Sequence, residues 1–553
     1  MKITIIQRNY IVADFTYNFN KIKQAIIEHH ASDLIVFSEL SVIGYYPYDL
    51  LLCDSFIHKQ DQVIAEITQL TKVYNTAVVI GVARAISGIK KYYNAALVID
   101  RGTLIFEYHK QLIPSYGVFD EARHFVAGET SPFFNFKGCK MALFICEDIW
   151  FNNHQGHKIN PVKDLVSSAV DCVISIHASP SILGKFEQRL KMVASITQYT
   201  QAPVVYCSQV GGFDELVYDG TSFVTNKKGE VVALAPSFKE GEITVDIHQL
   251  PSQNIAYPIS NRYQLILQHL MLGLKDYVVK CGFHGVVVGA SGGIDSALTL
   301  VIATLALGAN NVTVITMPSI YSSIGSVDDS AKLCNNLGIV LLKRDIQDEV
   351  NLACQNFQQY FGAKPKNVTQ ENIQARIRGR IVMEYANDKE LLMLTTGNKS
   401  ELAVGYATLY GDMCGALNCI GDLYKSEVYA LSNYINQHYG NIIPKEIIQK
   451  APSAELAHNQ KDTDSLPDYN VLDPMLKLYL EKDMLYPNEI SKLESIVDQI
   501  DHKQRERVYA MIKQSEFKRK QAPPILFVQR KSFGMGRRVP VTANFVNQSA
   551  LVH

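Results

Sequence analysis

The sequence carries almost no net charge and has no long hydrophobic run, and each absence excludes a class of protein. Its 53 Lys and Arg residues nearly balance 54 Asp and Glu residues, so the net charge is −1. Nucleic-acid coats and polybasic membrane binders depend on a large positive field, which this chain lacks. The longest mostly apolar stretch, residues 297–309, is shorter than the ~20 residues that span a bilayer. We therefore expect no nucleic-acid partner and no membrane partner.

Closely spaced cysteines are also missing. The ten cysteines are scattered along the chain, and none forms a C-x-x-C pair. A zinc site or a disulfide scaffold is therefore not expected. The chain begins with MKITIIQRNYIVADF, in which polar residues interrupt the apolar run before the core of a signal peptide could form. We expect a reduced, cytoplasmic protein.

Apolar residues are abundant, at 47% of the 553 residues, which excludes a mainly disordered chain and suits two large cores. Along the first half, short apolar runs that suit buried strands alternate with amphipathic stretches. The expected strands are residues 2–6, 33–37, 77–83, 94–100, 140–146, 171–176 and 203–207, and expected helices include residues 18–29 and 186–197. This alternation predicts a layered α/β domain over residues 1–250.

A segment that contains Pro, Ser and Asn, residues 251–261, is typical of a connector. The remainder, residues 262–553, predicts a second α/β domain with helices around a parallel sheet. Strands are expected at residues 285–289, 312–317, 339–343 and 390–396, helices at 262–280 and 296–307, and a loop over the Asp-, Ser- and Pro-rich residues 451–474.

The sharpest local signal is the sequence G-A-S-G-G-I-D-S, which follows an apolar strand and opens a helix. Its members are Gly289, Ala290, Ser291, Gly292, Gly293, Ile294, Asp295 and Ser296. Adjacent glycines allow a ligand to approach the backbone, and the hydroxyls and helix N-terminal N–H groups donate toward one point. The loop lacks the Lys of the common nucleoside-triphosphatase motif. A Gly-rich turn with Ser and Asp caps is the purely structural alternative.

Asp295, at the mouth of this helix, would repel a phosphate unless a cation lies between them, so we expect it to hold Mg²⁺. Glu401 follows another strand end and is a candidate for a second Mg²⁺ carboxylate, or otherwise an acid that complements a helix start. The loop resembles the pyrophosphatase loop of the ATP-pyrophosphatases, which adenylate a substrate and then displace AMP with an amine or sulfur nucleophile.

Asn372, Arg376 and Arg380 are spaced by four residues and would share one face of a helix. Both arginines would then point at one phosphate or carboxylate, unless this face is simply a solvated polar surface.

The second half resembles the NAD⁺ synthetases over most of residues 262–540. The motifs that carry the resemblance are NIQARIRGR (372–380), TTGNKSELAVGYATLYGD (395–412), PSAEL (452–456), MPSIYSS (317–323) and FKRKQAPP (517–524). The resemblance implies a doubly wound, adenine nucleotide alpha hydrolase-like domain, where ATP adenylates the carboxylate of deamido-NAD⁺ and ammonia then attacks. It implies ATP contacts from residues 289–296 and Thr396, deamido-NAD⁺ contacts from Asn372, Glu401 and Lys518, and Mg²⁺ near Asp295 and Glu401.

In the first half, Cys146 ends an apolar strand in FICEDIW (144–150), beside two acidic residues that should raise the pKa of its thiol. It therefore needs a base or a cation to act as a nucleophile, and without one it would be an inert, buried cysteine. Glu39 and Lys110 follow two other expected strands. Each could be an ordinary surface charge, but together the three side chains could meet above one sheet.

This set resembles the Glu–Lys–Cys triad of the nitrilase superfamily. GYYPYDL, YGVFDEARHF and ICEDIW are similar to the glutaminase domain attached to bacterial NAD⁺ synthetases. The resemblance covers about residues 1–250 and implies a four-layer α-β-β-α sandwich. It implies the general base Glu39, the oxyanion-stabilising Lys110, the nucleophile Cys146, and the glutamine-binding residues Tyr116, Ser179 and Lys185.

Together the two resemblances imply an enzyme that makes NAD⁺ from ATP, deamido-NAD⁺ and L-glutamine through an NAD-adenylate, and releases AMP, pyrophosphate and glutamate. They also imply a dimer-based homo-oligomer. Two alternatives remain at this point: another glutamine-fed adenylating amidoligase, or a non-catalytic nucleotide-binding relative. The second alternative predicts missing catalytic residues, whereas Glu39, Lys110, Cys146 and Asp295 are all present.

Overall fold

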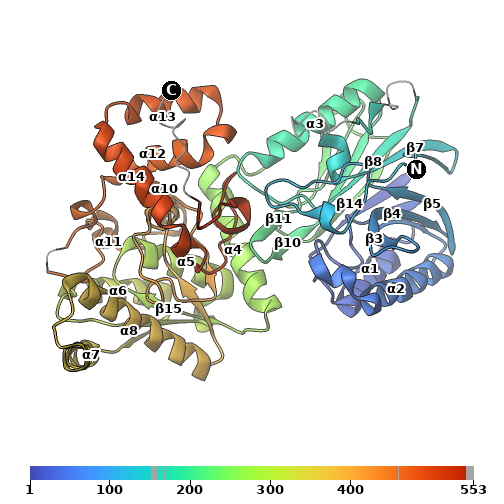
Figure 1. Cartoon of the computed structure of the whole chain (residues 1–553). Coiled ribbons are helices and arrows are strands. Elements are labelled where there is room, and N and C mark those ends of the chain that lie inside the picture. Colours follow the sequence, from blue (N-terminus) through green and yellow to red (C-terminus); the bar gives the residue numbers. More distant parts are fainter. Residues whose placement is uncertain (151–158, 164, 166–167, 459, 544–553) are drawn as a thin grey trace. The chain divides into compact units, whose positions relative to one another are not determined.

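The computed structural model describes residues 1–150, 159–163, 165, 168–458 and 460–543 (Figure 1). The chain forms two compact units. The first comprises Met1–Gly212 and Val217–Pro258, and the second comprises Phe213–Leu216 and the chain from residue 259 onward. None of the helices in the described part of the chain is long and apolar enough to cross a membrane.

Two six-stranded sheets form the centre of the first unit. The first sheet has the order β14 (Gly241–Asp246), β1 (Lys2–Gln7), β2 (Leu34–Val36), β3 (Ala77–Ala85), β4 (Tyr92–Asp100) and β5 (Thr103–His109). The second has the order β13 (Val231–Leu234), β12 (Phe223–Thr225), β9 (Val204–Ser208), β8 (Cys172–His177), β7 (Cys139–Ile145) and β6 (Phe133–Phe136). A separate hairpin joins β10 (Val210–Phe213) to β11 (Leu216–Asp219).

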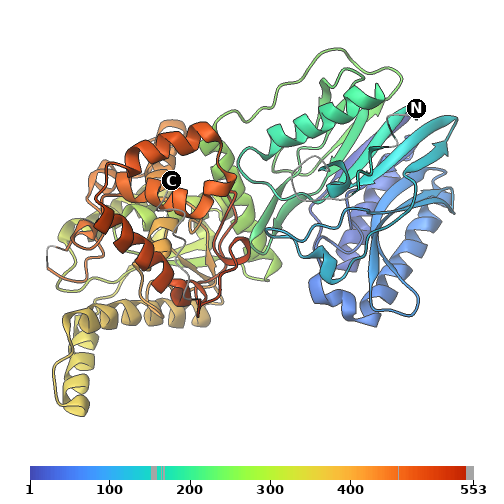
Figure 2. The same ribbon diagram turned by 45° about the horizontal axis from the view of Figure 1, so that its top comes forward.

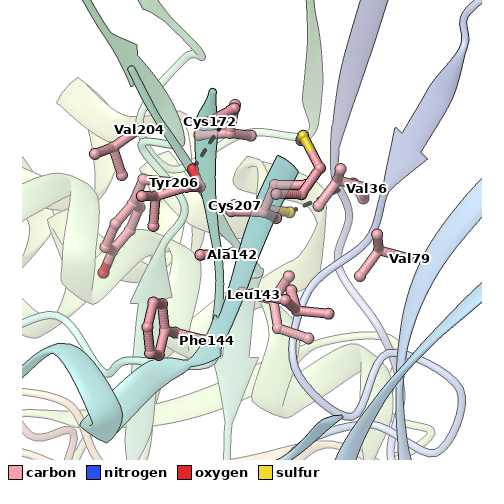
Figure 3. Close-up of a cluster of buried hydrophobic side chains, with 14 of the residues drawn as sticks. Val36, Val79, Ala142, Leu143, Phe144, Cys172, Val204, Tyr206 and Cys207 are labelled. Atoms are coloured by element: carbon pink, nitrogen blue, oxygen red, sulfur yellow. Dashed lines mark hydrogen bonds between the residues drawn. The ribbon is translucent and has the colours of Figure 1, made fainter. Parts of the chain in front are cut away.

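The two sheets pack face to face around one core. Val36 and Val79 of the first sheet face Leu143 and Cys207 of the second (Figure 3), and all four side chains are fully buried. Two helices, α1 (Phe15–Glu28) and α2 (Asp54–Val73), pair with each other beside the first sheet, while α3 (Lys185–Thr200) packs against β9. The result is the expected four-layer α-β-β-α sandwich.

Local sequence explains where helix α1 begins and which of its faces is buried. Asp14 caps α1 by accepting a hydrogen bond from the Tyr17 backbone N–H at 2.9 Å. The buried positions of α1 recur every three or four residues, at Phe15, Asn18, Ile22, Ala25 and Ile26. This spacing places one apolar stripe against the core.

The second unit contains one parallel sheet. Its order is β17 (Val340–Lys343), β16 (Val312–Thr316), β15 (Val286–Ala290), β18 (Leu392–Thr395) and β19 (Leu417–Asn418). Helix α4 (Arg262–Lys280) precedes the first of these strands, and the helices between the strands are α5 (Ile294–Leu307), α6 (Ile324–Leu337), α7 (Gln347–Phe361), α8 (Asn367–Asp388) and α9 (Lys399–Val404). Val287 packs with Val382 of α8, while its neighbours along β15 face the other side, as expected for a doubly wound fold.

The rest of the second unit is helical. It contains α10 (Lys425–Tyr439), α11 (Lys445–Gln449), α12 (Tyr469–Glu481), α13 (Pro487–Val497), α14 (His502–Gln514) and α15 (Glu516–Arg519) (Figure 2). The prediction of a loop over residues 451–474 is wrong at its end, because α12 begins at Tyr469 and contains Pro474. Buried residues continue through this proline, at Leu472, Met475 and Leu476, so core packing outweighs the lost backbone donor.

Candidate active sites

Three strand ends carry the thiol, ammonium and carboxylate of the first candidate site. Glu39 lies three residues beyond β2, Lys110 directly follows β5, and Cys146 directly follows β7. Because β2 and β5 belong to the first sheet and β7 to the second, the expectation that the three side chains lie above one sheet is wrong. Face-to-face packing brings the ends of both sheets together instead.

Lys110 connects the charges of this site. Its ammonium lies 2.8 Å from one carboxylate oxygen of Glu39 and 2.8 and 3.0 Å from the two oxygens of Glu121, and all three side chains are fully buried. Burial by itself would lower the pKa of Lys110, but the charges of Glu121 and Glu39 outweigh it and raise that pKa well above its ordinary value. Lys110 is therefore a permanent cation.

Cys146 lies within reach of this charge network. Burial, followed by the charge of Glu39, raises the pKa of its thiol well above the ordinary value, and Lys110 opposes the change. The resting side chain is therefore a thiol and not a thiolate. Its backbone φ of 44° places it in the left-handed region, a strained conformation that is common at functional sites.

Glu121 was not identified from the sequence, although it lies within the segment YGVFDEARHF. Tyr45 donates a hydrogen bond to it at 2.6 Å, and burial raises the pKa of Glu121 to about 7 against the opposing charge of Lys110.

Glu39 is held from two sides, by the Asn94 side-chain amide and the Ala178 backbone N–H, each at 2.8 Å. The carboxylate of Glu39 therefore has a fixed orientation.

The segment of Glu39 also depends on a close approach of backbones. A Cβ atom at Gly81 of β3 would lie 2.2 Å from the Leu40 nitrogen and 2.6 Å from the Ser38 oxygen. Only glycine leaves room for this contact, so Gly81 is needed to position the segment that carries Glu39.

Asp148 links the segments that carry Lys110 and Cys146. One of its oxygens accepts hydrogen bonds from the Gln111 and Leu112 backbone N–H groups at 3.0 and 2.9 Å. The other accepts from the Ile145 backbone N–H at 3.1 Å and from Tyr108 at 2.9 Å. A single buried carboxylate thus fixes the residues that follow Lys110 and precede Cys146.

The three predicted glutamine ligands lie around this network. Tyr116 donates to both oxygens of Glu147, the neighbour of Cys146, at 2.8 and 2.9 Å. Ser179 is buried, and the fully buried Arg189 donates to its carbonyl oxygen at 2.9 Å. Lys185 lies 4.0 Å above the ring of Trp150. Burial, and then Arg189, lower the pKa of Lys185 to about 8.

The second candidate site is a cavity of about 540 Å³ at the carboxyl ends of the parallel strands. Among the predicted residues that line it are Gly289, Ala290, Ser291, Gly293, Ile294, Asp295, Asn372, Thr396, Glu401 and Lys518. Gly292 and Ser296 belong to the same loop but not to the lining. The volume is within the range of small-molecule sites, and the position is where α/β sheets bind ligands.

The phosphate loop has the expected strand–turn–helix geometry. Gly292 has a φ of 75°, and a Cβ atom there would lie 2.5 Å from the carbonyl oxygen of Ser326. The hydroxyls of Ser291 and Ser296 lie 3.2 Å apart, and the Gly293 N–H donates to the Ser291 hydroxyl at 3.3 Å. Donors therefore gather where the helix α5 begins.

Lys425 joins the two predicted metal carboxylates and was not identified from the sequence. Its ammonium lies 2.5 Å from Asp295 and 3.2 Å from Glu401. Burial raises the pKa of Glu401 to about 8, with Lys425 opposing and Asp295 adding to the shift. Glu401 also forms a capping box with Asn398 at the start of helix α9. The Asn398 amide donates to Asp295 at 2.9 Å. Glu401 can therefore cap the helix and face the predicted metal site at the same time.

Two further predicted residues of the lining, Asn372 and Lys518, come from helices α8 and α15. Asn372 accepts a hydrogen bond from Thr408 at 2.8 Å. Lys518 donates to the carbonyl oxygens of Gly405 and Ala407 at 2.8 and 2.7 Å. The ammonium group of Lys518 is thus held at the cavity by backbone carbonyl oxygens.

The prediction that Arg376 and Arg380 point at one target is wrong. Arg376 donates to the Leu409 carbonyl oxygen, whereas Arg380 pairs with Glu349. The arginine of α8 that lines the cavity is Arg378, and burial lowers its pKa to about 10. A four-residue spacing identifies a shared helix face but not which face meets the ligand.

The donor set of the cavity limits how a metal could bind. In the part of the chain that the structure describes, no group of three His, Cys, Asp or Glu side chains is arranged to hold a metal ion. Asp295 and Glu401 nevertheless reach one common cation, the ammonium of Lys425. Mg²⁺ needs only one or two protein carboxylates when substrate phosphates supply other ligands, so these residues fit it.

Comparison with protein families assigns each half of the chain separately. Residues 2–255 match the carbon-nitrogen hydrolase family, and residues 266–522 match the NAD synthase family. The first match contains Glu39, Lys110 and Cys146, and the second contains the phosphate loop and Lys425.

Comparison with whole proteins unites the two halves. The chain is 37% identical to the glutamine-dependent NAD(+) synthetase of Synechocystis sp. over 99% of this chain and 100% of that one, and 37% identical to that of Thermotoga maritima over 99% of both. It is 36% identical to a solved glutamine-dependent NAD⁺ synthetase from Acinetobacter baumannii in complex with ADP, with a TM-score of 0.76 over 98% of both chains. The chain therefore belongs to the glutamine-dependent NAD(+) synthetases, ligases that make NAD⁺ with nitrogen taken from glutamine.

Proposed function

We propose that Cys146, Glu39 and Lys110 release ammonia from L-glutamine. The observation that carries this proposal is the burial of all three side chains at one edge of the sandwich, with Lys110 bonded to Glu39 and close enough to Cys146 to affect its pKa. Burying an ammonium costs free energy that its ion pairs offset only in part, and perturbed ionisable groups of this kind are concentrated at active sites.

Because the pKa of the Cys146 thiol is raised, the thiol needs a base that removes its proton during the attack. Glu39 takes the thiol proton as the sulfur attacks the amide carbon of glutamine. Lys110, with a backbone N–H at Glu147, stabilises the negative charge on the amide oxygen. The carbon–nitrogen bond then breaks, Glu39 returns the proton to the leaving nitrogen, and ammonia departs from a thioester. Glu39 next activates a water molecule, which releases glutamate and restores the thiol.

Tyr116, Ser179 and Lys185 orient glutamine for this attack. The ammonium of Lys185 suits the α-carboxylate of an amino acid, because an anion there would offset the burial that lowers its pKa. Tyr116 and Ser179 would contribute hydroxyl groups.

In the second unit we propose that residues 289–296 and Thr396 bind ATP, and that Asn372, Glu401 and Lys518 contact deamido-NAD⁺. The phosphate loop and helix α5 would hold the phosphates through backbone N–H groups and hydroxyls. The dinucleotide carboxylate attacks the α-phosphorus, and ammonia later displaces AMP from the resulting adenylate.

Asp295 and Glu401 would hold Mg²⁺, which when bound neutralises charge on the ATP phosphates. Lys425 neutralises the same carboxylates through its ion pairs. Its ammonium can turn toward a phosphate once a metal ion occupies the carboxylates.

The domain limits and the assembly are part of the proposal. We propose a glutaminase domain over residues 1–250, a connector over 251–261 and a synthetase domain over 262–553, supported by separate family matches to residues 2–255 and 266–522. A dimer-based assembly is supported by exposed apolar side chains on α7, where Tyr360 and Phe361 are 77% and 72% exposed. In Figure 2 this helix projects from the rest of its unit. Sedimentation of the Tyr360→Lys, Phe361→Lys double variant should show a smaller particle than the parent.

All ten cysteines are free thiols, which supports a reducing, cytoplasmic setting. Fractionation of the producing cell would place the enzyme with cytoplasmic markers.

Cys146→Ala tests the two-site scheme. The variant should lose glutamine-driven NAD⁺ synthesis and retain synthesis from ammonium chloride, measured with equal ATP and deamido-NAD⁺. Cys172→Ala, which removes a buried thiol inside β8, is the matched control and should support both reactions. Loss of both reactions in a folded Cys146→Ala variant, or of neither, contradicts the assignment.

A further inference from the structure

A carboxylate of the protein fills an anion-binding site in the wall of the second cavity. One oxygen of Glu455 accepts hydrogen bonds from the Ser323 hydroxyl at 3.1 Å, the Ser326 hydroxyl at 2.6 Å and the Lys450 ammonium at 2.8 Å. Lys450 also donates to the Ser326 hydroxyl. Three donors thus converge on one oxygen, an arrangement that suits a phosphate oxygen as well as a carboxylate.

This site borders the phosphate loop. The Ser326 backbone contacts Gly292 so closely that a Cβ atom on the glycine would lie 2.5 Å from its carbonyl oxygen. Ser326, Lys450 and Glu455 line the same cavity as Ser291 and Asp295. Phosphates held by the loop would therefore extend toward the donors that now hold Glu455.

Glu455 is held in a strained conformation. Its backbone φ is 47°, in the left-handed region that is unfavourable for a residue with a side chain. Its side chain and that of Lys450 remain 17% and 28% exposed to the cavity, so neither is locked in the core. An ion pair of this exposure contributes little to stability and can be replaced.

We propose that Ser323, Ser326 and Lys450 form the binding site for the pyrophosphate leaving group, and that Glu455 occupies this site until the phosphates displace it. The inference rests on the proposed role of residues 289–296 as the ATP phosphate loop. During adenylation a carboxylate oxygen of deamido-NAD⁺ forms a bond to the α-phosphorus. The bond from the α-phosphorus to the bridging oxygen breaks, and its electron pair leaves with the pyrophosphate. Lys450 compensates the negative charge that develops there.

Substitutions of Lys450 and of Glu455 should then change the affinity for magnesium pyrophosphate in opposite directions. Lys450→Met removes a donor and should weaken the binding of magnesium pyrophosphate about tenfold. Glu455→Gln removes the competing anion, so a larger fraction of the protein is free to bind, and binding should become about fivefold tighter. An ion pair that only orders residues 450–455 predicts weaker binding in both variants.

The experiment is calorimetric titration of the full-length protein with inorganic pyrophosphate and Mg²⁺, followed by product inhibition of ammonium-driven synthesis. Ammonium as donor keeps the glutaminase outside the measurement. Lys450→Met should lower kcat about tenfold with an unchanged KM for deamido-NAD⁺, and Glu455→Gln should make pyrophosphate a stronger inhibitor. Lys332→Met removes an exposed Lys–Glu pair on α6 and is the matched control, without effect on either quantity.

The outcomes separate this inference from the assignment of the phosphate loop. Affinity changes of opposite sign in Lys450→Met and Glu455→Gln support it. Weaker pyrophosphate binding in Ser291→Ala, with unchanged or equally weakened binding in both other variants, overturns the inference and leaves the phosphate loop in place. Unchanged binding in all three variants overturns both.

Discussion

The two sites use buried charge in different ways. In the glutaminase site the ammonium of Lys110 and the carboxylates of Glu39 and Glu121 are fully buried and satisfy one another. In the synthetase site the ammonium groups of Lys425 and Lys450 pair with carboxylates that line an open cavity. We infer that the first set of charges acts without rearrangement, whereas in the second set ion pairs inside the protein are exchanged for substrate phosphates.

This difference follows from what each site must bind. Glutamine brings a neutral amide to the thiol, so the charges needed for its cleavage can be fixed in advance. ATP and the dinucleotide bring several negative charges, and a cavity with unpaired cations would be costly when empty. Carboxylates such as Asp295 and Glu455 lower that cost.

The largest expected effect is that of Lys425→Met. The change leaves Asp295 and Glu401 without their shared cation, and the pKa of Glu401, already raised to about 8 by burial, should rise further. NAD⁺ synthesis should fall about 10³-fold with either nitrogen donor. The assay is NAD⁺ formation from ammonium, beside glutamate release from glutamine. Lys482→Met, which breaks an exposed pair with Glu494, should leave both rates within threefold, as expected for a surface ion pair worth about 0.5 kcal/mol.

Glu121→Gln tests the glutaminase site. The variant removes one of the two carboxylates that hold Lys110, so the ammonium is less well positioned and its pKa falls. Glutamine hydrolysis should decrease about 100-fold, while ammonium-driven synthesis is unchanged. Glu107→Gln, on the neighbouring strand β5, is the matched control, since Glu107 pairs with the partly exposed Arg84. Equal losses in the two variants would show that Glu121 has no special role.

Asp148→Asn should have a smaller effect on the same site. The NH2 group of the amide faces either the Gln111 and Leu112 N–H groups or the Ile145 N–H group, so one or two hydrogen bonds are replaced by repulsive contacts. We expect about 2 kcal/mol of lost stability and a decrease of about 30-fold in kcat for glutamine hydrolysis. Thermal unfolding and glutamate release measure the two quantities. A loss of stability with unchanged kcat would mean that Asp148 does not position the catalytic residues.

Much of the architecture could be predicted from local patterns. Apolar runs identified β3 and β15, and the glycines of the phosphate loop identified the turn between β15 and α5. These features depend on residues that are neighbours in sequence. The hypothesis of a triad of Glu39, Lys110 and Cys146 could be made as well, because short motifs around these residues resemble the nitrilase superfamily.

The polar partners could not be predicted. Glu121 contacts Lys110, which is 11 residues away along the chain. Lys425 contacts Glu401 and Asp295, 24 and 130 residues away, and Glu455 contacts Ser326 and Ser323, 129 and 132 residues away. The periodicity of a sequence does not indicate which charged side chains will form ion pairs in the folded protein. The same limitation explains why Arg376 and Arg380 were grouped together while Arg378, on another face of α8, was missed.

The smallest expected effect is a pH dependence of KM for glutamine, which the KM for deamido-NAD⁺ should not share. Burial, and then Arg189, lower the pKa of Lys185 to about 8, so the free enzyme loses this positive charge as the pH rises through 8. If Lys185 binds the glutamine carboxylate, KM for glutamine should rise by up to about tenfold per pH unit above that value, with kcat nearly constant. Lys185→Arg keeps its charge and should flatten the profile. KM for deamido-NAD⁺, measured with ammonium, should not follow the same curve, because Lys185 belongs to the glutaminase site alone.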